Sequence, residues 1–168
     1  GDENIERAIE SFKKCTELKP ASSMYHLWLG RAYGLKAMNA GIFKAMGVVG
    51  DVKESFLKAV ELDPKNFEAR VDLVQFYLQA PGIAGGSTSK AEKQAEEYSR
   101  IDPELGKLLW TTVYAHDEEF EKAGQQLASE GYPNIDALEQ AILFSSMIPK
   151  NPEKPDSFDP RLKEWMNR

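Results

Sequence analysis

Three prolines close similar stretches of this 168-residue chain: Pro20 ends "ELKP", Pro64 ends "ELDP" and Pro103 ends "RIDP". A proline ring cannot continue an α-helix, so each proline marks a helix end. The residues twelve positions before the prolines are small or medium and apolar, namely Ala8, Val52 and Ala91. The residues eight positions before them are Phe12, Phe56 and Ala95. The same helical unit therefore recurs along the chain, which favours a stack of like helices.

A second set of helices is expected between these prolines. Each carries a large residue, then a smaller one, then a tyrosine three positions further, so that all three lie along one side. The three sets are Leu29, Gly30 and Tyr33; Leu73, Val74 and Tyr77; and Trp110, Thr111 and Tyr114. The smaller middle residue lets a neighbouring helix approach closely. We expect core contacts between adjacent helices at Phe12, Tyr33, Phe56 and Tyr77.

This pattern resembles the tetratricopeptide repeat, a helix-turn-helix unit of about 34 residues. The best copy runs from Leu29-Gly30 and Tyr33 through Val52 and Phe56 to Pro64. The resemblance implies an all-α fold, a right-handed solenoid of antiparallel helix pairs. It implies a repeat domain over 1–134, made of a half-repeat (3–20) and repeats 23–64, 67–103 and 104–134. Residues 135–168 would add a capping helix, a proline-rich segment and a short terminal helix.

The repeats are longer than the family's. Pro20 and Pro64 lie 44 residues apart, and Pro64 and Pro103 lie 39 apart, with the excess between the two helices of each repeat. The first insertion is expected to lengthen its helices, with Met38, Ile42, Ala45 and Met46 on one stripe. An insertion lobe is then expected, consisting of Ile42, Phe43, Val48, Val49 and Ile83. Mutual burial of these side chains is favoured over an apolar patch left for a partner.

The stretch "LQAPGIAGGSTSKAEKQ", from Leu78 to Gln94, resembles a phosphate-binding loop. A P-loop, however, places its lysine directly after a glycine and follows a strand, whereas Lys90 follows Ser89 after a predicted helix. We therefore expect a connection between two helices rather than an anion site. Ser89 and Glu92 fit a capping box for the second helix.

Catalytic and metal-binding constellations are not apparent. His26 and His116 lie far apart without ligand-spaced partners, and Cys15 takes the inward position of its helix, where a packing thiol is expected. No catalytic residue, metal or cofactor is predicted, and the chain is not expected to be an enzyme. A nucleotide enzyme or hydrolase using the glycine loop is the least favoured class.

Composition excludes some classes of binding partner. A net charge of -6 argues against nucleic acid, and no apolar run approaches the roughly 18 residues of a membrane span. A soluble protein is expected, either cytoplasmic or exported if a leader preceded Gly1. It is expected to be a monomer or a weak homodimer, and its partner a protein or peptide.

The family resemblance implies a concave groove lined by the first helix of each repeat. The groove positions would be Met24, Leu27, Arg31, Glu68, Val71, Gln75, Leu108 and Thr112. Leu27 and Arg31 replace the lysine and asparagine with which some family members clamp a peptide carboxylate, which leaves Arg31 as the one anion contact. The expected function is a non-enzymatic interaction scaffold that uses the groove or the insertion lobe. The alternative is an assembly module that self-associates through the lobe.

The C-terminal segment carries its own prediction. Asp136 to Met147 has helical periodicity, and several prolines then impose an extended path. Leu162, Trp165 and Met166 share one face of a short final helix. Such a short helix needs a surface to lie on, so Trp165 is expected to anchor it on the repeats, with an undocked tail or a partner-binding segment as the alternative.

Overall fold

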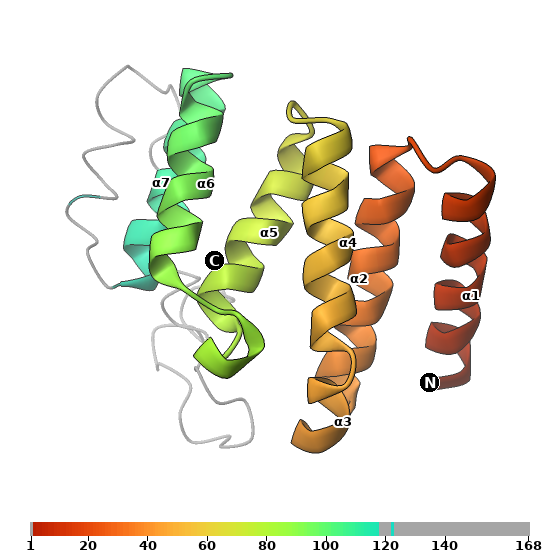
Figure 1. Cartoon of the computed structure of the whole chain (residues 1–168). Helices are drawn as coiled ribbons and strands as arrows, with labels where there is room; N and C mark the ends of the chain where they lie inside the picture. Colours follow the sequence, from red (N-terminus) through yellow and green to blue (C-terminus); the bar gives the residue numbers. More distant parts are fainter. Residues whose placement is uncertain (1, 118–121, 123–168) are drawn as a thin grey trace, which may run out of the picture. The chain divides into compact units, whose positions relative to one another are not determined.

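The computed structural model describes residues 2–117 and 122, and the regular structure in this part of the chain is entirely helical, which confirms the all-α class there. The elements are α1 (Asp2–Leu18), α2 (Ser23–Asn39), α3 (Ile42–Met46), α4 (Val49–Leu62), α5 (Phe67–Gln79), the 3-10 helix η1 (Gly82–Ala84), α6 (Thr88–Ser99) and α7 (Pro103–His116) (Figure 1). The chain divides into two units, residues 1–113 and 114–168. The helix expected from Asp136 to Met147 and the docking of Trp165 lie outside the described residues.

Two of the three prolines mark helix ends as predicted. The first and fourth helices, α1 and α4, end two residues before Pro20 and Pro64. Pro103 differs, because α6 already ends at Ser99 and Pro103 is the first residue of α7, where its missing N–H costs nothing. Asp102 lies just before it and accepts hydrogen bonds of 3.0 Å from the amides of Glu104 and Leu105. The acidic residue before the proline therefore caps the start of the next helix.

Within the first unit, helices that follow one another pack together. The pairs in contact include α1 with α2, α2 with α4, α4 with α5, and α5 with α6, and α2 also touches α5, while the short helix α3 contacts α2 and α4 (Figure 1). Tyr33, Phe56 and Tyr77 are buried, as predicted, whereas Phe12 is half-buried and stacks on Trp28 with 6.2 Å between ring centroids. The largest fully buried side chains are Leu27, Leu73, Val74, Leu109 and Val113.

The predicted close approach at Gly30 is confirmed. A Cβ atom added to Gly30 would lie 2.6 Å from Cδ1 and Cε1 of Phe56 and 3.1 Å from Cβ of Ser55. The ring of Phe56 on α4 therefore occupies the space that a larger residue on α2 would need. This contact fixes the distance between α2 and α4. It also determines which sides of the two helices face away from each other.

Buried and half-buried polar contacts join α2, α4 and the start of α5. Ser23 Oγ at the start of α2 donates to the carbonyl of Ala59 on α4, at 2.7 Å. Asn66 Nδ2 donates to Ser23 Oγ at 2.8 Å, and Asn66 Oδ1 accepts from the amide of Ala69 at 3.1 Å. Asn66 thus caps α5 and also ties it to α2.

Arg70 is a buried cation between α5 and α6. It is 3% exposed, and its guanidinium reaches Gln94 and Glu97 and lies 5.8 Å from the ring centroid of Tyr98. Its Nε atom has no hydrogen-bond partner. A buried charge is accommodated between the two helices because α6 supplies its polar partners.

The first insertion differs from the prediction. The second helix, α2, ends at Asn39, and Ala40 is extended (φ −89°, ψ 149°), so the chain enters a separate short helix, α3, before α4 begins. The extended residue breaks the helical register, and the predicted stripe through Met38, Ile42, Ala45 and Met46 on one continuous helix is wrong.

Candidate binding surface on α2 and α5

One face of α2 carries large apolar side chains that remain exposed. They are Met24, Trp28, Leu35 and Met38, with exposed fractions of 46%, 43%, 53% and 82%. Together with Arg31 they are separated alternately by four and three positions, so they follow one side of the helix. The rest of the helix circumference holds Leu27, Gly30 and Tyr33, which are buried. We call the four exposed side chains the α2 apolar face.

Arg31 lies at the centre of this face and is held by two carboxylates of α5. Its Nε lies 2.6 Å from Asp72 Oδ2, and a terminal nitrogen lies 3.0 Å from Glu68 Oε2. Its guanidinium carbon is also 4.8 Å from the ring centroid of Trp28, in reach of a cation–π contact. Burial acts to lower the pKa of Arg31, but the hydrogen bonds and charges of Asp72 and Glu68 outweigh it and raise that pKa above its ordinary value.

Arg31 is therefore not the available anion contact that the sequence suggested. Its positive charge is met by two negative ones, so the cluster of Arg31, Glu68 and Asp72 carries a surplus carboxylate. The side chain of Glu68 is 60% exposed and that of Asp72 is 17% exposed. A cation that approaches this cluster would meet Glu68 first.

The corresponding face of α5 is polar. Counting the same number of residues from Pro64 as from Pro20, the counterparts of Met24, Trp28, Arg31 and Leu35 are Glu68, Asp72, Gln75 and Gln79. Helix packing alone therefore does not require apolar residues at these positions. The exposed apolar residues are specific to α2, and α5 carries polar residues at the equivalent positions.

The remaining predicted groove positions differ in accessibility. Leu27 is 0% exposed, so it belongs to the core and cannot meet a partner, which corrects the prediction for this residue. Gln75 is exposed, whereas Val71, Leu108 and Thr112 are half-buried. Thr112 Oγ1 donates to the carbonyl of Leu108 at 3.0 Å.

Sequence reasoning missed Trp28, Leu35 and Asp72. Trp28 and Leu35 could have been found by counting alternate steps of four and three from Met24. Asp72 gave no comparable signal, because its pairing with Arg31 spans 41 positions of the chain.

The residues of the insertion lobe are not brought into one buried cluster. Val48 and Val49 are half-buried, and Ile83 is 87% exposed. Mutual burial is therefore wrong for Ile83, because η1 carries it at the surface of the connection between α5 and α6. The structure does not describe the side chains of Ile42 and Phe43.

The glycine stretch is a connection between α5 and α6, as predicted. Four consecutive amides donate to carbonyls of the same segment: Ala84 and Gly86 to Pro81, Gly85 to Gly82, and Ser87 to Tyr77. Gly85 is left-handed, with φ of 98°, which favours glycine. These amides are already used within the connection, so they do not form a cradle for phosphate oxygens.

The cap of α6 is Ser87 rather than Ser89. Ser87 is extended and its Oγ accepts from the amide of Lys90 at 3.4 Å, whereas Ser89 lies inside the helix. The predicted capping box of Ser89 and Glu92 is therefore wrong. The short helix η1 and the turn at Gly85 let α6 begin two residues earlier than the capping box requires.

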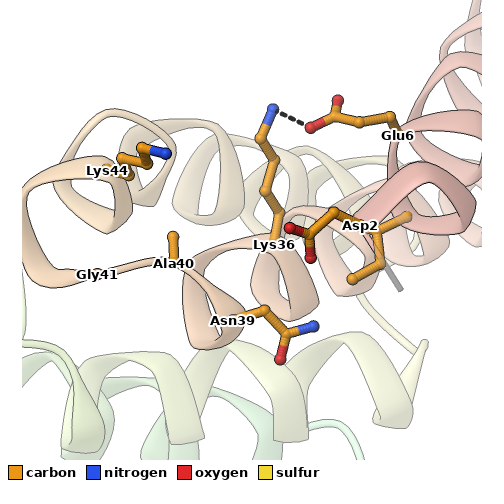
Figure 2. Close-up of a pocket in the computed structure, with 8 residues that line it drawn as sticks. Asp2, Glu6, Lys36, Asn39, Ala40, Gly41 and Lys44 are labelled. Atoms are coloured by element: carbon orange, nitrogen blue, oxygen red, sulfur yellow. Dashed lines mark ion pairs between the residues drawn. The ribbon is translucent and has the colours of Figure 1, made fainter.

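A small pocket of about 220 Å³ lies between the start of α1 and the end of α2 with α3. Its charged lining consists of Asp2, Glu6, Lys36 and Lys44, and Lys36 Nζ lies 2.7 Å from Glu6 Oε1 (Figure 2). Two positive and two negative side chains balance each other, so the pocket favours no class of charged ligand.

The described residues include no group of three or more histidine, cysteine or acidic side chains placed to hold a metal ion. His26 Nε2 lies 3.1 Å from the carbonyl oxygen of Pro20, and His116 Nδ1 lies 3.1 Å from Asp117 Oδ1. Cys15 is a half-buried free thiol. None of the helices described is long and apolar enough to cross a bilayer.

No protein-family model matches the chain, and no curated protein matches it.

Proposed function

We propose that this chain is a non-enzymatic protein-interaction scaffold of the tetratricopeptide type, in which helix pairs stack into a solenoid. The order of contacts in the first unit supports the proposal, because α1 packs on α2, α2 on α4, α4 on α5 and α5 on α6, and the first helices of the two proposed pairs, α2 and α5, also touch. The contact between Gly30 and Phe56 supports it as well, since both residues belong to the repeat pattern.

The observation that carries the proposal is the α2 apolar face. Complete burial of one leucine or methionine side chain contributes about 1.5–3 kcal/mol, so exposing four large apolar side chains on one side of a helix is costly unless a partner covers them. Tryptophan and arginine are the residues that most often dominate binding energy at protein interfaces. Trp28 and Arg31 lie in contact at the centre of this face.

Peptide display on the intact chain tests this function. Peptides selected on the wild type should lose at least about tenfold in affinity for Leu35→Asp, because a carboxylate would interrupt the apolar face. Leu57→Asp is the matched control, since Leu57 lies on α4 and is 39% exposed against 53% for Leu35. Failure to select any peptide, or equal losses in the two variants, would overturn the proposal. Circular dichroism confirms that both variants fold.

Self-association is the second candidate. Met46 is 41% exposed and Ile83 is 87% exposed, so the elements of the insertions also present apolar side chains. Light scattering over a range of concentrations separates the two candidates. A dimer that Ile83→Asp dissociates and Leu35→Asp leaves intact would favour assembly through the insertions.

A further inference from the structure

The spacing along the α2 apolar face matches the seam of a helix pair. Positions 24, 28, 31, 35 and 38 alternate in steps of four and three, an average of about 3.5 residues. Two helices that pack along such a seam stay in register over several turns, because each side chain of one enters a gap on the other. From Met24 to Met38 the seam is roughly 21 Å long at about 1.5 Å per residue.

The charges beside the seam also indicate the charge of its partner. Of the two lysine or arginine residues of α2, Arg31 is paired with Glu68 and Asp72, and Lys36 is paired with Glu6. The surplus carboxylate of the Arg31 cluster has no second cation among these contacts, and Glu68 is the more exposed of its two acids. Complementary charge on a partner would be positive and would lie near the middle of the seam.

A second copy of the chain does not meet this requirement. In an antiparallel pair of α2 helices about a twofold axis, Arg31 would lie at the axis, because Met24 and Met38 are each seven positions away. Each copy would bring its own Glu68 and Asp72, so two clusters with surplus negative charge would face each other. Like charges placed together at an interface cost free energy, whereas a basic partner removes the imbalance.

We propose that the α2 apolar face binds one amphipathic α-helix of a partner protein, with an apolar seam of the same spacing and a Lys or Arg side chain against Glu68. This inference rests on the proposed function and adds the class of partner. Such a helix satisfies its own backbone hydrogen bonds, and binding then needs only its apolar seam and its basic flank. The partner is thus distinguished from an acidic peptide, which Glu68 and Asp72 would repel.

Three synthetic helical peptides of about 20 residues, long enough to cover the seam, test the proposal. The first has leucine at seam positions and lysine beside them, the second replaces the lysines by glutamate, and the third keeps the composition of the first with its seam scrambled. Fluorescence anisotropy with the full chain should show the first binding at least about tenfold more tightly than either other peptide. The scrambled peptide controls for unspecific attraction to a chain of net charge -6.

The acidic contact is tested by Glu68→Gln with Glu61→Gln as its control. Glu61 lies on α4, its side chain is 68% exposed and it pairs with Lys58, much as the 60% exposed Glu68 pairs with Arg31. We expect Glu68→Gln to lower the affinity for the lysine-containing peptide about three- to tenfold. Glu61→Gln should change that affinity less than twofold. Equal affinity for the lysine and glutamate peptides, or equal effects of the two variants, would overturn the proposed partner class.

The outcomes separate the two proposals. Selected peptides that depend on Leu35 but are neither basic nor helical would refute the partner class and leave the scaffold function standing. A dimer of the chain that Leu35→Asp dissociates would identify a second copy as the occupant and refute the partner class. If no peptide binds in a Leu35-dependent way, both proposals fail.

Discussion

Arg31 on α2 and Asp72 on α5 are joined by a hydrogen-bonded ion pair, with 2.6 Å between Nε and Oδ2. The pair links α2 to α5 and fixes the guanidinium beside Trp28. It therefore serves both the packing of α2 on α5 and the shape of the proposed binding surface.

Asp72→Asn should lower the free energy of unfolding by about 1–2 kcal/mol, because it removes a charge-assisted hydrogen bond that is largely shielded from water. Glu68→Gln should cost less than about 1 kcal/mol, since the Glu68 side chain is 60% exposed and water screens its ion pair. Urea unfolding measures both. Indistinguishable costs would contradict the different burial of the two carboxylates.

Gly30→Ala and Gly34→Ala should change stability in opposite directions, although both replace a glycine of α2. Alanine at position 30 forces the Phe56 ring to move and should cost about 1–3 kcal/mol. Alanine at position 34 meets nothing within 4 Å and should stabilise the helix by about 0.5–1 kcal/mol. Thermal and urea unfolding provide the comparison, and a stabilising Gly30→Ala would rule out the close approach of α2 and α4.

Ser87→Ala should destabilise the chain by about 0.5–1 kcal/mol, because the Ser87 side chain caps α6 by accepting a hydrogen bond from the amide of Lys90. Ser89→Ala should change the unfolding free energy by less than about 0.5 kcal/mol, since Ser89 is an exposed residue inside the helix. The same unfolding measurement distinguishes the two positions. A larger effect at Ser89 would restore the capping box that the sequence suggested.

Tyr98 should make the chain less stable at high pH. Burial raises its pKa above the ordinary value of about 10, and the charge of Asp102 raises it further. The folded state thus keeps a proton that the unfolded state releases, so the stability is complete below about pH 10 and falls as pH rises toward the folded pKa. Tyr98→Phe should reduce the decrease in unfolding free energy between about pH 9 and 11, as measured by urea unfolding.

The variant has a separate effect at neutral pH. Tyr98 donates a hydrogen bond of 3.0 Å to the carbonyl of Lys65, so Tyr98→Phe should also lower stability by about 1 kcal/mol at pH 7. The slope of the unfolding free energy against pH, rather than its absolute value, is therefore the informative quantity. An unchanged slope in the variant would show that Tyr98 does not contribute to the alkaline loss.

Local signals in the sequence were sufficient for much of the fold. Pro20 and Pro64 end helices through a steric rule that needs no tertiary information, and the small residue Gly30 indicated a close helix contact that the structure contains. Signals that had two local solutions were less reliable. Ser87 and Ser89 are both good caps, and the conformation of the connection decides between them.

The binding surface was harder to predict because it depends on distant pairs. Arg31 resembles an available cation when only α2 is considered, and its neutralisation requires Asp72 and Glu68 on another helix. Leu27 likewise resembles a surface residue in the repeat pattern, but the packing of the helices buries it completely. Burial and charge pairing across helices are the two properties that periodicity alone does not supply.

The most direct test of the account is an NMR titration of the full chain with a display-selected peptide, following backbone amide shifts. The largest changes are expected between residues 24 and 38 of α2 and near Glu68 and Asp72 of α5. Amides around Leu57 on α4 and in the connection 80–87 should change little. Changes centred on α4 or on that connection, with α2 unaffected, would contradict the claim that the α2 apolar face is the binding surface.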